Sequence, residues 1–341
     1  MSHLFQFSRL KPQNINNGGS RILATKSNFP ALQGMSLYKL MLNPKAVREP
    51  HWHANADELG YCLQGKALVS IFATGNVKST FQIEKGQAFF IPSGSLHSIE
   101  NVGEDPIEII LQFSSDTPED FALSTSFGMF SDAVLGNTWH VPANKFQSFK
   151  RTTKEVFIAE GKTPFNIPDD AHYHTVYQYN LDTASPLVST QGGTAKVARK
   201  DVWPILHRQA LYSLLLNGAG MREPHWHPET AELGYVEKGK GRMSIMSPSG
   251  KIDTYVMEPG DIYFIPKAYP HHIENLTDED LHLLIFFDQP MPADIGFTAS
   301  IKSFPNEVLT EVLKIPKDFF TSLPTYYQDL FIVEKINPVD P

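Results

Sequence analysis

The sequence has 341 residues, of which 41% are hydrophobic and 19% charged, a composition typical of a folded globular protein with room for two domains. Its formal net charge of -8 argues against a surface that neutralises nucleic-acid phosphates, because such surfaces cluster lysine and arginine. The single cysteine, Cys62, excludes an intramolecular disulfide and any cysteine-based zinc or iron–sulfur site. We therefore expect any metal to be held by nitrogen and oxygen atoms.

Residues 1–10 alternate polar and apolar side chains and lack the apolar core of a secretory signal. No stretch of the sequence approaches the roughly 20 apolar residues that span a bilayer. The sequence therefore predicts a cytoplasmic protein that has neither a membrane nor a nucleic acid as a partner.

An internal repeat organises the chain. The segment REPHWHANADELGYCLQGK, which starts at Arg48, returns from Arg222 as REPHWHPETAELGYVEKGK, an offset of 174 residues. The same offset relates Pro30 to Pro204, and the register has no gap from about residue 29 to about residue 113. Such a register indicates two copies of one domain.

Within the first copy, short apolar or alternating runs predict β-strands, which are separated by turn residues such as Gly75 and Asn76. In chain order the predicted strands cover residues 36–42, 60–63, 67–72, 80–83, 88–91 and 107–113. Many short strands at regular spacing favour an all-β sandwich or barrel. Helical patterns follow each set of strands, at residues 131–135 and 306–314. Each half is therefore expected to be a barrel followed by a small helical appendage.

The segment that joins the halves, residues 137–168, ends in a Pro/Asp cluster at residues 167–170, which indicates a turn. We place the domain boundary near residue 168. The predicted domains are residues 1–168 and residues 169–341. The apolar content of the appendages favours packing against a partner subunit.

Candidate metal ligands stand out in the first copy. His51 and His53 are two residues apart, so on a strand both side chains project from the same face. Glu58 follows after one turn, and His97 comes from a distant strand. Three imidazoles and one carboxylate leave open positions on an octahedral ion such as Mn(II) or Fe(II), and substrate or dioxygen would occupy those positions.

The second copy repeats the set as His225, His227, Glu232 and His271. In both copies the last histidine follows the glutamate by 39 residues. Unrelated histidine pairs would not share this spacing. The sequence therefore predicts two metal ions per chain. The same ligands serve manganese, iron, nickel and zinc, and the sequence does not choose among them.

These segments resemble the two conserved motifs of the cupin family, whose members are jelly-roll β-barrels. The first copy matches the second motif in full, at Gly86, Pro92, Gly94, His97 and Asn101. The second copy keeps Gly260, Pro266, His271 and Asn275, and has Ala268 where the motif has glycine. The resemblance implies a protein of two tandem cupin domains.

Among two-barrel cupins, the chain is most similar to the oxalate decarboxylases, manganese enzymes that convert oxalate and a proton to formate and carbon dioxide. Arg48 and Arg222 each stand three residues before the first histidine of a cluster. This position matches the arginine that contacts the substrate carboxylate in that family. A planar, permanently charged guanidinium suits a small dianion.

The reaction also needs a group that takes up and returns a proton. In the family this group is a glutamate on a lid after the barrel, and by position the resemblance implies Glu119 here. The second copy has Ala293 at that offset, so a catalytic Glu119 would make the first site the reactive one. Asp116 and Asp294 remain alternatives.

The resemblance leaves three functions open. The first is decarboxylation of oxalate or a similar small dicarboxylate. The second is oxidation of oxalate by dioxygen, as in oxalate oxidase, and the third is metal-dependent binding of a small ligand without turnover. The family also implies a homo-oligomer, either a trimer or a hexamer.

Overall fold

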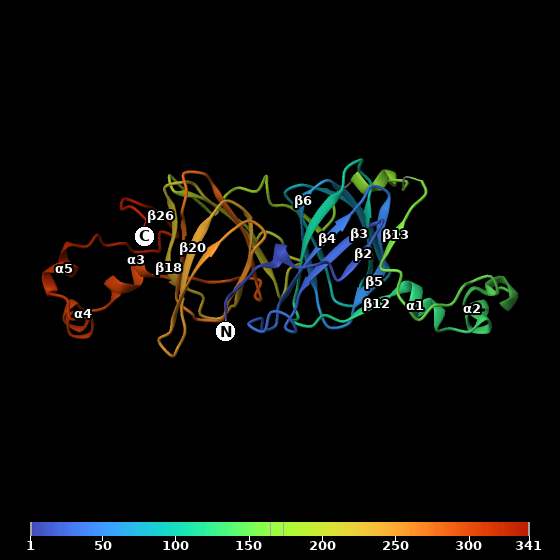
Figure 1. Ribbon diagram of the computed structural model, residues 1–341, viewed down its shortest axis with the longest axis horizontal. Helices are drawn as coiled ribbons and strands as arrows, with labels where there is room; N and C mark the ends of the chain where they lie inside the picture. The colour runs from blue at the N-terminus through green and yellow to red at the C-terminus, as the bar shows by residue number, and fades with distance from the viewer. Residues whose placement is uncertain (1, 164, 173, 340–341) are drawn as a thin grey trace. The chain divides into compact units, whose positions relative to one another are not determined.

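The computed structural model describes residues 2–163, 165–172 and 174–339 (Figure 1). The chain forms two compact units by its internal contacts. One unit, called the N-terminal barrel here, contains residues 11–28 and 34–182. The other, the C-terminal barrel, contains residues 2–10, 29–33 and 183–339 of the described chain. The predicted all-β fold of two repeated barrels is confirmed.

The N-terminal barrel has two antiparallel sheets. The first runs in the order β14 (Gln178–Asn180), β9 (Gln87–Ile91), β6 (Glu58–Gln64), β11 (Ile107–Phe113), β4 (Ser36–Leu42), β3 (Gly19–Ala24) and β2 (Asn14–Asn16). The second runs in the order β12 (Asp120–Ala122), β5 (Ala46–His53), β10 (Leu96–Asn101), β7 (Lys66–Ala73) and β8 (Val77–Glu84), and β13 (Ile158–Glu160) also pairs with β5.

The C-terminal barrel repeats this topology. Its first sheet runs in the order β1 (Leu4–Phe5), β22 (Ile262–Ile265), β19 (Glu232–Lys238), β24 (Leu281–Phe287), β17 (Ala210–Leu216), β16 (Gly193–Ala198) and β15 (Val188–Thr190). Its second runs in the order β21 (Ile252–Met257), β20 (Gly241–Met246), β23 (His271–Asn275), β18 (Gly220–Trp226) and β25 (Ile295–Gly296), with β26 (Ile332–Glu334) paired to β18.

Small helices follow each barrel, as predicted. The N-terminal barrel is followed by α1 (Leu123–Gly128), α2 (Asp132–Trp139) and the short 3-10 helix η2 (Ala143–Phe146). The C-terminal barrel is followed by α3 (Phe297–Ser300), η4 (Ile301–Ser303), α4 (Asn306–Leu313) and α5 (Lys317–Ser322). Two further 3-10 turns are η1 (Phe7–Arg9) and η3 (Asp169–His172). None of these helices is long and apolar enough to cross a bilayer, within the part of the chain that the structure describes.

The core of each barrel lies between its two sheets. In β17, buried leucines and alanine point inward at Ala210, Leu214 and Leu216, because alternate residues of a strand face one side of a sheet. The inner faces also carry a few buried polar side chains, including His51 and His225. Burying such groups is costly unless each finds a partner, so their position marks the site.

The division into barrels does not follow the expected boundary at residue 168. Strand β14, which begins the second repeat, pairs with β9 of the N-terminal barrel, where Gln178 lies opposite Phe89. Strand β1, which begins the first repeat, pairs with β22 of the C-terminal barrel, where Leu4 lies opposite Tyr263. Both pairs are related by the 174-residue offset. The two repeats therefore exchange their leading strands, and the N-terminal barrel extends to residue 182.

Candidate metal centres

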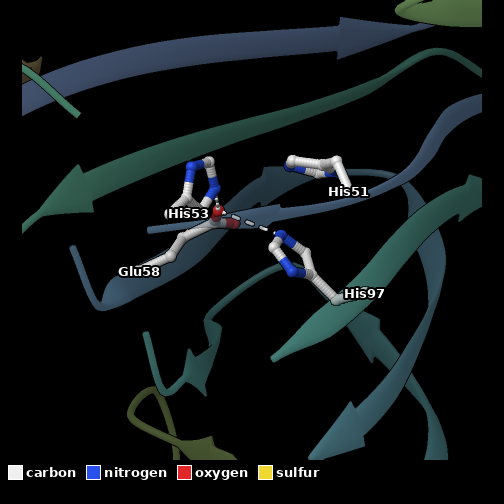
Figure 2. A group of neighbouring side chains, drawn as sticks. All are labelled: His51, His53, Glu58 and His97. Atoms are coloured by element: carbon white, nitrogen blue, oxygen red, sulfur yellow. Dashed lines mark hydrogen bonds and ion pairs between the residues drawn. The ribbon is translucent and has the colours of Figure 1, made fainter. Parts of the chain in front are cut away.

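The structure brings together the four predicted ligands of the N-terminal barrel. His51 and His53 lie on β5, Glu58 begins β6, and His97 lies on β10, directly opposite His51 in the sheet register. All four side chains are buried and converge on one point, as Figure 2 shows. Their ligand atoms all lie within 4.8 Å of one another.

Glu58 is the centre of this cluster. Its Oε2 atom lies 2.9 Å from Nε2 of His53 and 3.3 Å from Nε2 of His97 (Figure 2). The C-terminal barrel has the same arrangement, in which Oε2 of Glu232 lies 2.9 Å from Nε2 of His227 and 3.5 Å from Nε2 of His271. The Nε2 atoms of these histidines therefore face inward.

Backbone carbonyls fix the orientation of two histidines in each cluster. Nδ1 of His51 donates to the carbonyl oxygen of Glu49 at 2.8 Å, and Nδ1 of His97 donates to that of Ser95 at 2.9 Å. A carbonyl only accepts, so the proton sits on Nδ1 and the lone pair of Nε2 is free for a metal. His225 and His271 make the corresponding bonds in the other barrel.

A metal ion fits these residues. Among the described residues, the buried atoms without a hydrogen-bond partner include Oε1 of Glu58, Nε2 of His97 and Nε2 of His271. Buried polar atoms in native proteins are nearly always satisfied, so each exception needs an explanation. A divalent cation bound between the histidines and the glutamate supplies the missing partner, and the set of nitrogen and oxygen donors suits a transition metal.

The ionisation states of the cluster residues also fit a bound metal ion. Burial lowers the pKa of His51 well below its ordinary value, so this imidazole is neutral. Burial also acts to raise the pKa of Glu58, but the contacts with His97 and His53 outweigh it and hold the pKa at about 2. For His53, burial is outweighed by hydrogen bonds to Asp120 and Glu58, which raise the pKa to about 9. A cation that binds the metal-free cluster therefore competes with the proton that His53 holds between its two carboxylate partners.

The two barrels differ at the residue that faces the second oxygen of the ligand glutamate. The phenol of Tyr263 donates to Oε1 of Glu232 at 2.7 Å. The corresponding residue of the N-terminal barrel is Phe89, which has no hydroxyl, and Oε1 of Glu58 has no hydrogen-bond partner within the described chain. The second oxygen of the ligand carboxylate is thus occupied in one barrel and free in the other.

Both predicted substrate arginines lie at these clusters. Arg48 is buried, donates from Nη1 to the carbonyl oxygen of Phe157 at 3.3 Å, and pairs from Nη2 with Asp120 at 3.2 Å. Arg222 makes the same contacts with Phe331 and Asp294. In the N-terminal barrel, a cavity of about 10 Å³ is lined by ten residues, Arg21, Tyr38, Leu40, Arg48, His51, His53, Glu58, Ile99, Leu111 and Phe113.

The structure does not bring Glu119 to the cluster. Its side chain is exposed, and its backbone N–H donates to the side chain of Asn55. The next residue, Asp120, starts β12 opposite His53, and successive residues of a strand point to opposite sides, so Asp120 faces inward and Glu119 outward. Asp116 lies in a half-buried bend and pairs with Lys26. Of the three carboxylates predicted as candidate proton carriers, Glu119, Asp116 and Asp294, only Asp294 contacts a cluster.

Sequence reasoning missed Asp120 and the two phenylalanines beside the arginines. The repeat itself was the available signal, since 174 residues separate Asp120 from Asp294 and Phe157 from Phe331. Phe157 and Phe331 have φ angles of 68° and 65°, a left-handed conformation that a bulky side chain rarely adopts. Such strain persists where the surrounding structure enforces it, often at functional sites.

A family model described as "Cupin" matches residues 5–147 and again residues 179–318. The chain belongs to the cupin family. Both matched segments contain one complete His3Glu cluster, so each cupin repeat carries its own candidate metal site.

Several relatives of this cupin are oxalate decarboxylases. It is 28% identical over 316 residues to oxalate decarboxylase OxdC of Bacillus subtilis, which covers 89% of this chain and 80% of that protein. It is 24% identical over 327 residues to an oxalate decarboxylase of Arthroderma benhamiae, covering 87% of this chain and 76% of that protein. A solved structure of the Bacillus subtilis enzyme, studied for its Mn(II) centres, superposes with a TM-score of 0.87 at 25% identity, covering 98% of this chain and 89% of that one.

Proposed function

We propose that this cupin decarboxylates oxalate, or a similarly small dicarboxylate, to formate and carbon dioxide, with one Mn(II) ion in each His3Glu cluster. The observation that carries the proposal is that Arg48 and the ligands His51, His53 and Glu58 line one buried cavity. The likeness to oxalate decarboxylases over most of the chain supports the reaction. The Mn(II) centres of the Bacillus subtilis enzyme support the choice of metal.

The cluster residues would hold the ion, which supplies a Lewis acid that binds and polarises the substrate. Arg48 donates to carboxylate oxygens and stays charged, so it binds one end of the substrate and stabilises charge on it. The rest of the cavity wall is largely apolar, at Leu40, Ile99, Leu111 and Phe113. These side chains exclude water, which strengthens the electrostatic contacts of Arg48.

The reaction moves one proton. When the carbon–carbon bond of hydrogen oxalate breaks, one carbon leaves as carbon dioxide and the other receives the proton to become formate. A carboxylate of the chain is expected to hold this proton between the two events. Asp120 is the carboxylate beside Arg48, and Glu119 is the one that the resemblance implies.

One observation favours a second function, the oxidation of oxalate by dioxygen to carbon dioxide and hydrogen peroxide. Glu119, the expected proton carrier of the decarboxylase, is exposed and away from the cluster. An oxidase does not need to protonate carbon, because its substrate carbons both leave as carbon dioxide and the electrons pass to dioxygen.

The test is to purify the protein with added manganese, measure bound metals, and follow oxalate, formate, carbon dioxide and hydrogen peroxide together. Decarboxylation predicts two metals per chain and one formate for each oxalate consumed. Arg48→Ala is expected to lose formate production and keep both metals, with Arg222→Ala as its matched control in the other barrel. Glu119→Gln and Asp120→Asn, compared at equal metal content, then identify the proton carrier.

Peroxide without formate would assign the oxidase. Two bound metals with neither product would overturn both reactions and leave the third function, ligand binding without turnover.

We further propose that the protein is a homo-oligomer, a trimer or a pair of trimers. Large apolar side chains on the appendages support this, since Trp139 is 53% exposed and Val312 is 72% exposed. Light scattering after size exclusion measures the mass directly, and a monomer would contradict the proposal.

A further inference from the structure

A second arginine reaches the cavity of the N-terminal barrel. Arg21 lies on β3, its side chain is 12% exposed, and it lines the same cavity as Arg48 and the metal ligands. We propose that Arg21 and Arg48 together form a two-guanidinium site that binds a dicarboxylate, so that Arg21 determines substrate specificity in this barrel. This inference rests on the proposed function, because it concerns the substrate of the same site.

Asp120 marks where an anion binds. Its Oδ2 atom lies 3.0 Å from Nη1 of Arg21 and 3.2 Å from Nη2 of Arg48, and its Oδ1 atom lies 2.7 Å from Nδ1 of His53. The protein's own carboxylate therefore satisfies both guanidinium groups, with two charge-assisted contacts to one oxygen. A substrate carboxylate that reaches the arginines must displace Asp120 and would find both groups already in place.

Phe157 holds the two arginines in position. The guanidinium carbon of Arg21 and that of Arg48 each lie 4.0 Å from the centre of the Phe157 ring. Nε of Arg21 also donates to the side chain of Asn14 at 3.1 Å. Cations at this distance from an aromatic ring are attracted to it, and a side chain fixed in advance loses less entropy when it binds.

The C-terminal barrel lacks the second arginine. The residue that corresponds to Arg21 is Ala195. Among the described residues, Arg222 is the one arginine that lines the cavity at the second cluster. Arg199 lies four positions further along, but its guanidinium pairs with Asp201 at 2.6 Å and does not line the cavity. With identical metal ligands, the first cavity has one more positive group than the second.

This difference assigns the dicarboxylate substrate to the N-terminal barrel. A hydrogen bond to a charged group is worth enough to change affinity by about 10- to 100-fold. A dicarboxylate can place one carboxylate between the two guanidinium groups, as Asp120 does, and the other at the metal ligands that line the same cavity. A monocarboxylate can do only one of these, so its affinity should depend less on Arg21. If Arg21 determines specificity, its removal weakens dicarboxylate binding more than monocarboxylate binding. If its role is only structural, its removal weakens both equally.

The experiment measures oxalate and formate binding by calorimetry to the metal-loaded protein, in an Arg222→Ala background that removes the arginine of the second cavity. Arg21→Gln is expected to weaken oxalate binding about 10- to 100-fold and to change formate binding less. In the assay, the KM for oxalate should rise more than kcat falls. Ala195→Arg, in the otherwise native chain, should strengthen oxalate binding in the C-terminal barrel.

Metal content and thermal unfolding serve as folding controls, and Arg21→Lys is the second variant if Arg21→Gln misfolds. Equal loss of oxalate and formate affinity in a folded, fully metallated variant would overturn the proposal, as would oxalate binding unchanged by either variant. Native protein that binds oxalate in an Arg21-dependent way without turnover would refute the proposed reaction and support the assignment of Arg21. Native protein that does not bind oxalate would overturn both.

Discussion

The carboxylate of Asp120 lies 2.7 Å from Nδ1 of His53, so the outer nitrogen of this candidate ligand faces a side chain, while those of His51 and His97 face backbone carbonyls. Of these contacts, only the one from Asp120 can be removed by substitution. A carboxylate in this position fixes the ring and makes the inward nitrogen a better donor.

Asp120→Asn is therefore expected to weaken metal binding in the N-terminal barrel by about 10- to 100-fold. Competition with a chelator, followed by the metal remaining per chain, measures the change. Asp116→Asn is the control, because Asp116 is a half-buried carboxylate on the same segment whose partners are Lys26 and Gly34 and not a metal ligand. Equal affinities for the two variants would show that Asp120 does not support His53.

Metal affinity is expected to rise with pH up to about pH 9. In the metal-free protein, hydrogen bonds to Asp120 and Glu58 outweigh burial and raise the pKa of His53 to about 9, and His227 behaves alike. Below that pH a cation must displace a proton, so affinity falls by up to about tenfold per pH unit. Calorimetry at pH 7 in buffers of different ionisation enthalpy should detect a released proton. An affinity that is constant between about pH 7 and pH 9 would contradict this expectation.

Exchanging the equivalent residues Tyr263 and Phe89 should change the stability of the metal-free protein in opposite directions. Tyr263→Phe removes the hydrogen bond to Oε1 of Glu232 and leaves that buried oxygen without the tyrosine's O–H. The metal-free protein should lose about 1–3 kcal/mol of stability, and the stabilisation gained on adding metal should increase. Phe89→Tyr should act in the opposite direction in the N-terminal barrel. Thermal unfolding with and without metal measures both, and changes of the same sign would refute the comparison.

Gly60→Ala should destabilise the N-terminal barrel. A Cβ atom at Gly60 would lie 2.2 Å from the ring of Phe89, which packs against the glycine on the neighbouring strand β9. Overpacking of this kind costs about 1–3 kcal/mol. Gly103→Ala is the control, since the nearest atom to its new Cβ lies at 3.5 Å. Denaturant unfolding distinguishes them, and equal midpoints would show that the ring moves aside without cost.

Much of the fold and of the candidate site was predictable because a repeat doubles every local signal. The spacing of His51, His53, Glu58 and His97 recurs in the second half, and the structure brings both sets together. Asp120 escaped because the neighbouring Glu119 matched the family by position, although the offset that pairs Glu119 with Ala293 also pairs Asp120 with Asp294. Arg21 escaped because a single arginine on a strand has no pattern that places it beside residues far along the chain.

The domain boundary could not be predicted from the sequence for a different reason. Strand β1 has two residues and β14 has three, which is too short for an alternation of polar and apolar residues to show. The pairing partners of β14 are about 90 residues away and those of β1 more than 250 residues away. The exchange therefore depends on tertiary contacts that no local pattern encodes.

The exchange of leading strands has consequences for a fragment of this chain and for a chain with a single repeat. A fragment that ends at residue 168 would lose β14 and expose the edge of β9, and an unpaired edge invites association. Two copies of a single-repeat chain could satisfy each other by trading the same short strand, as in a domain-swapped dimer. Joining the two repeats in one polypeptide allows equivalent positions to differ, as Arg21 and Ala195, or Phe89 and Tyr263, do here.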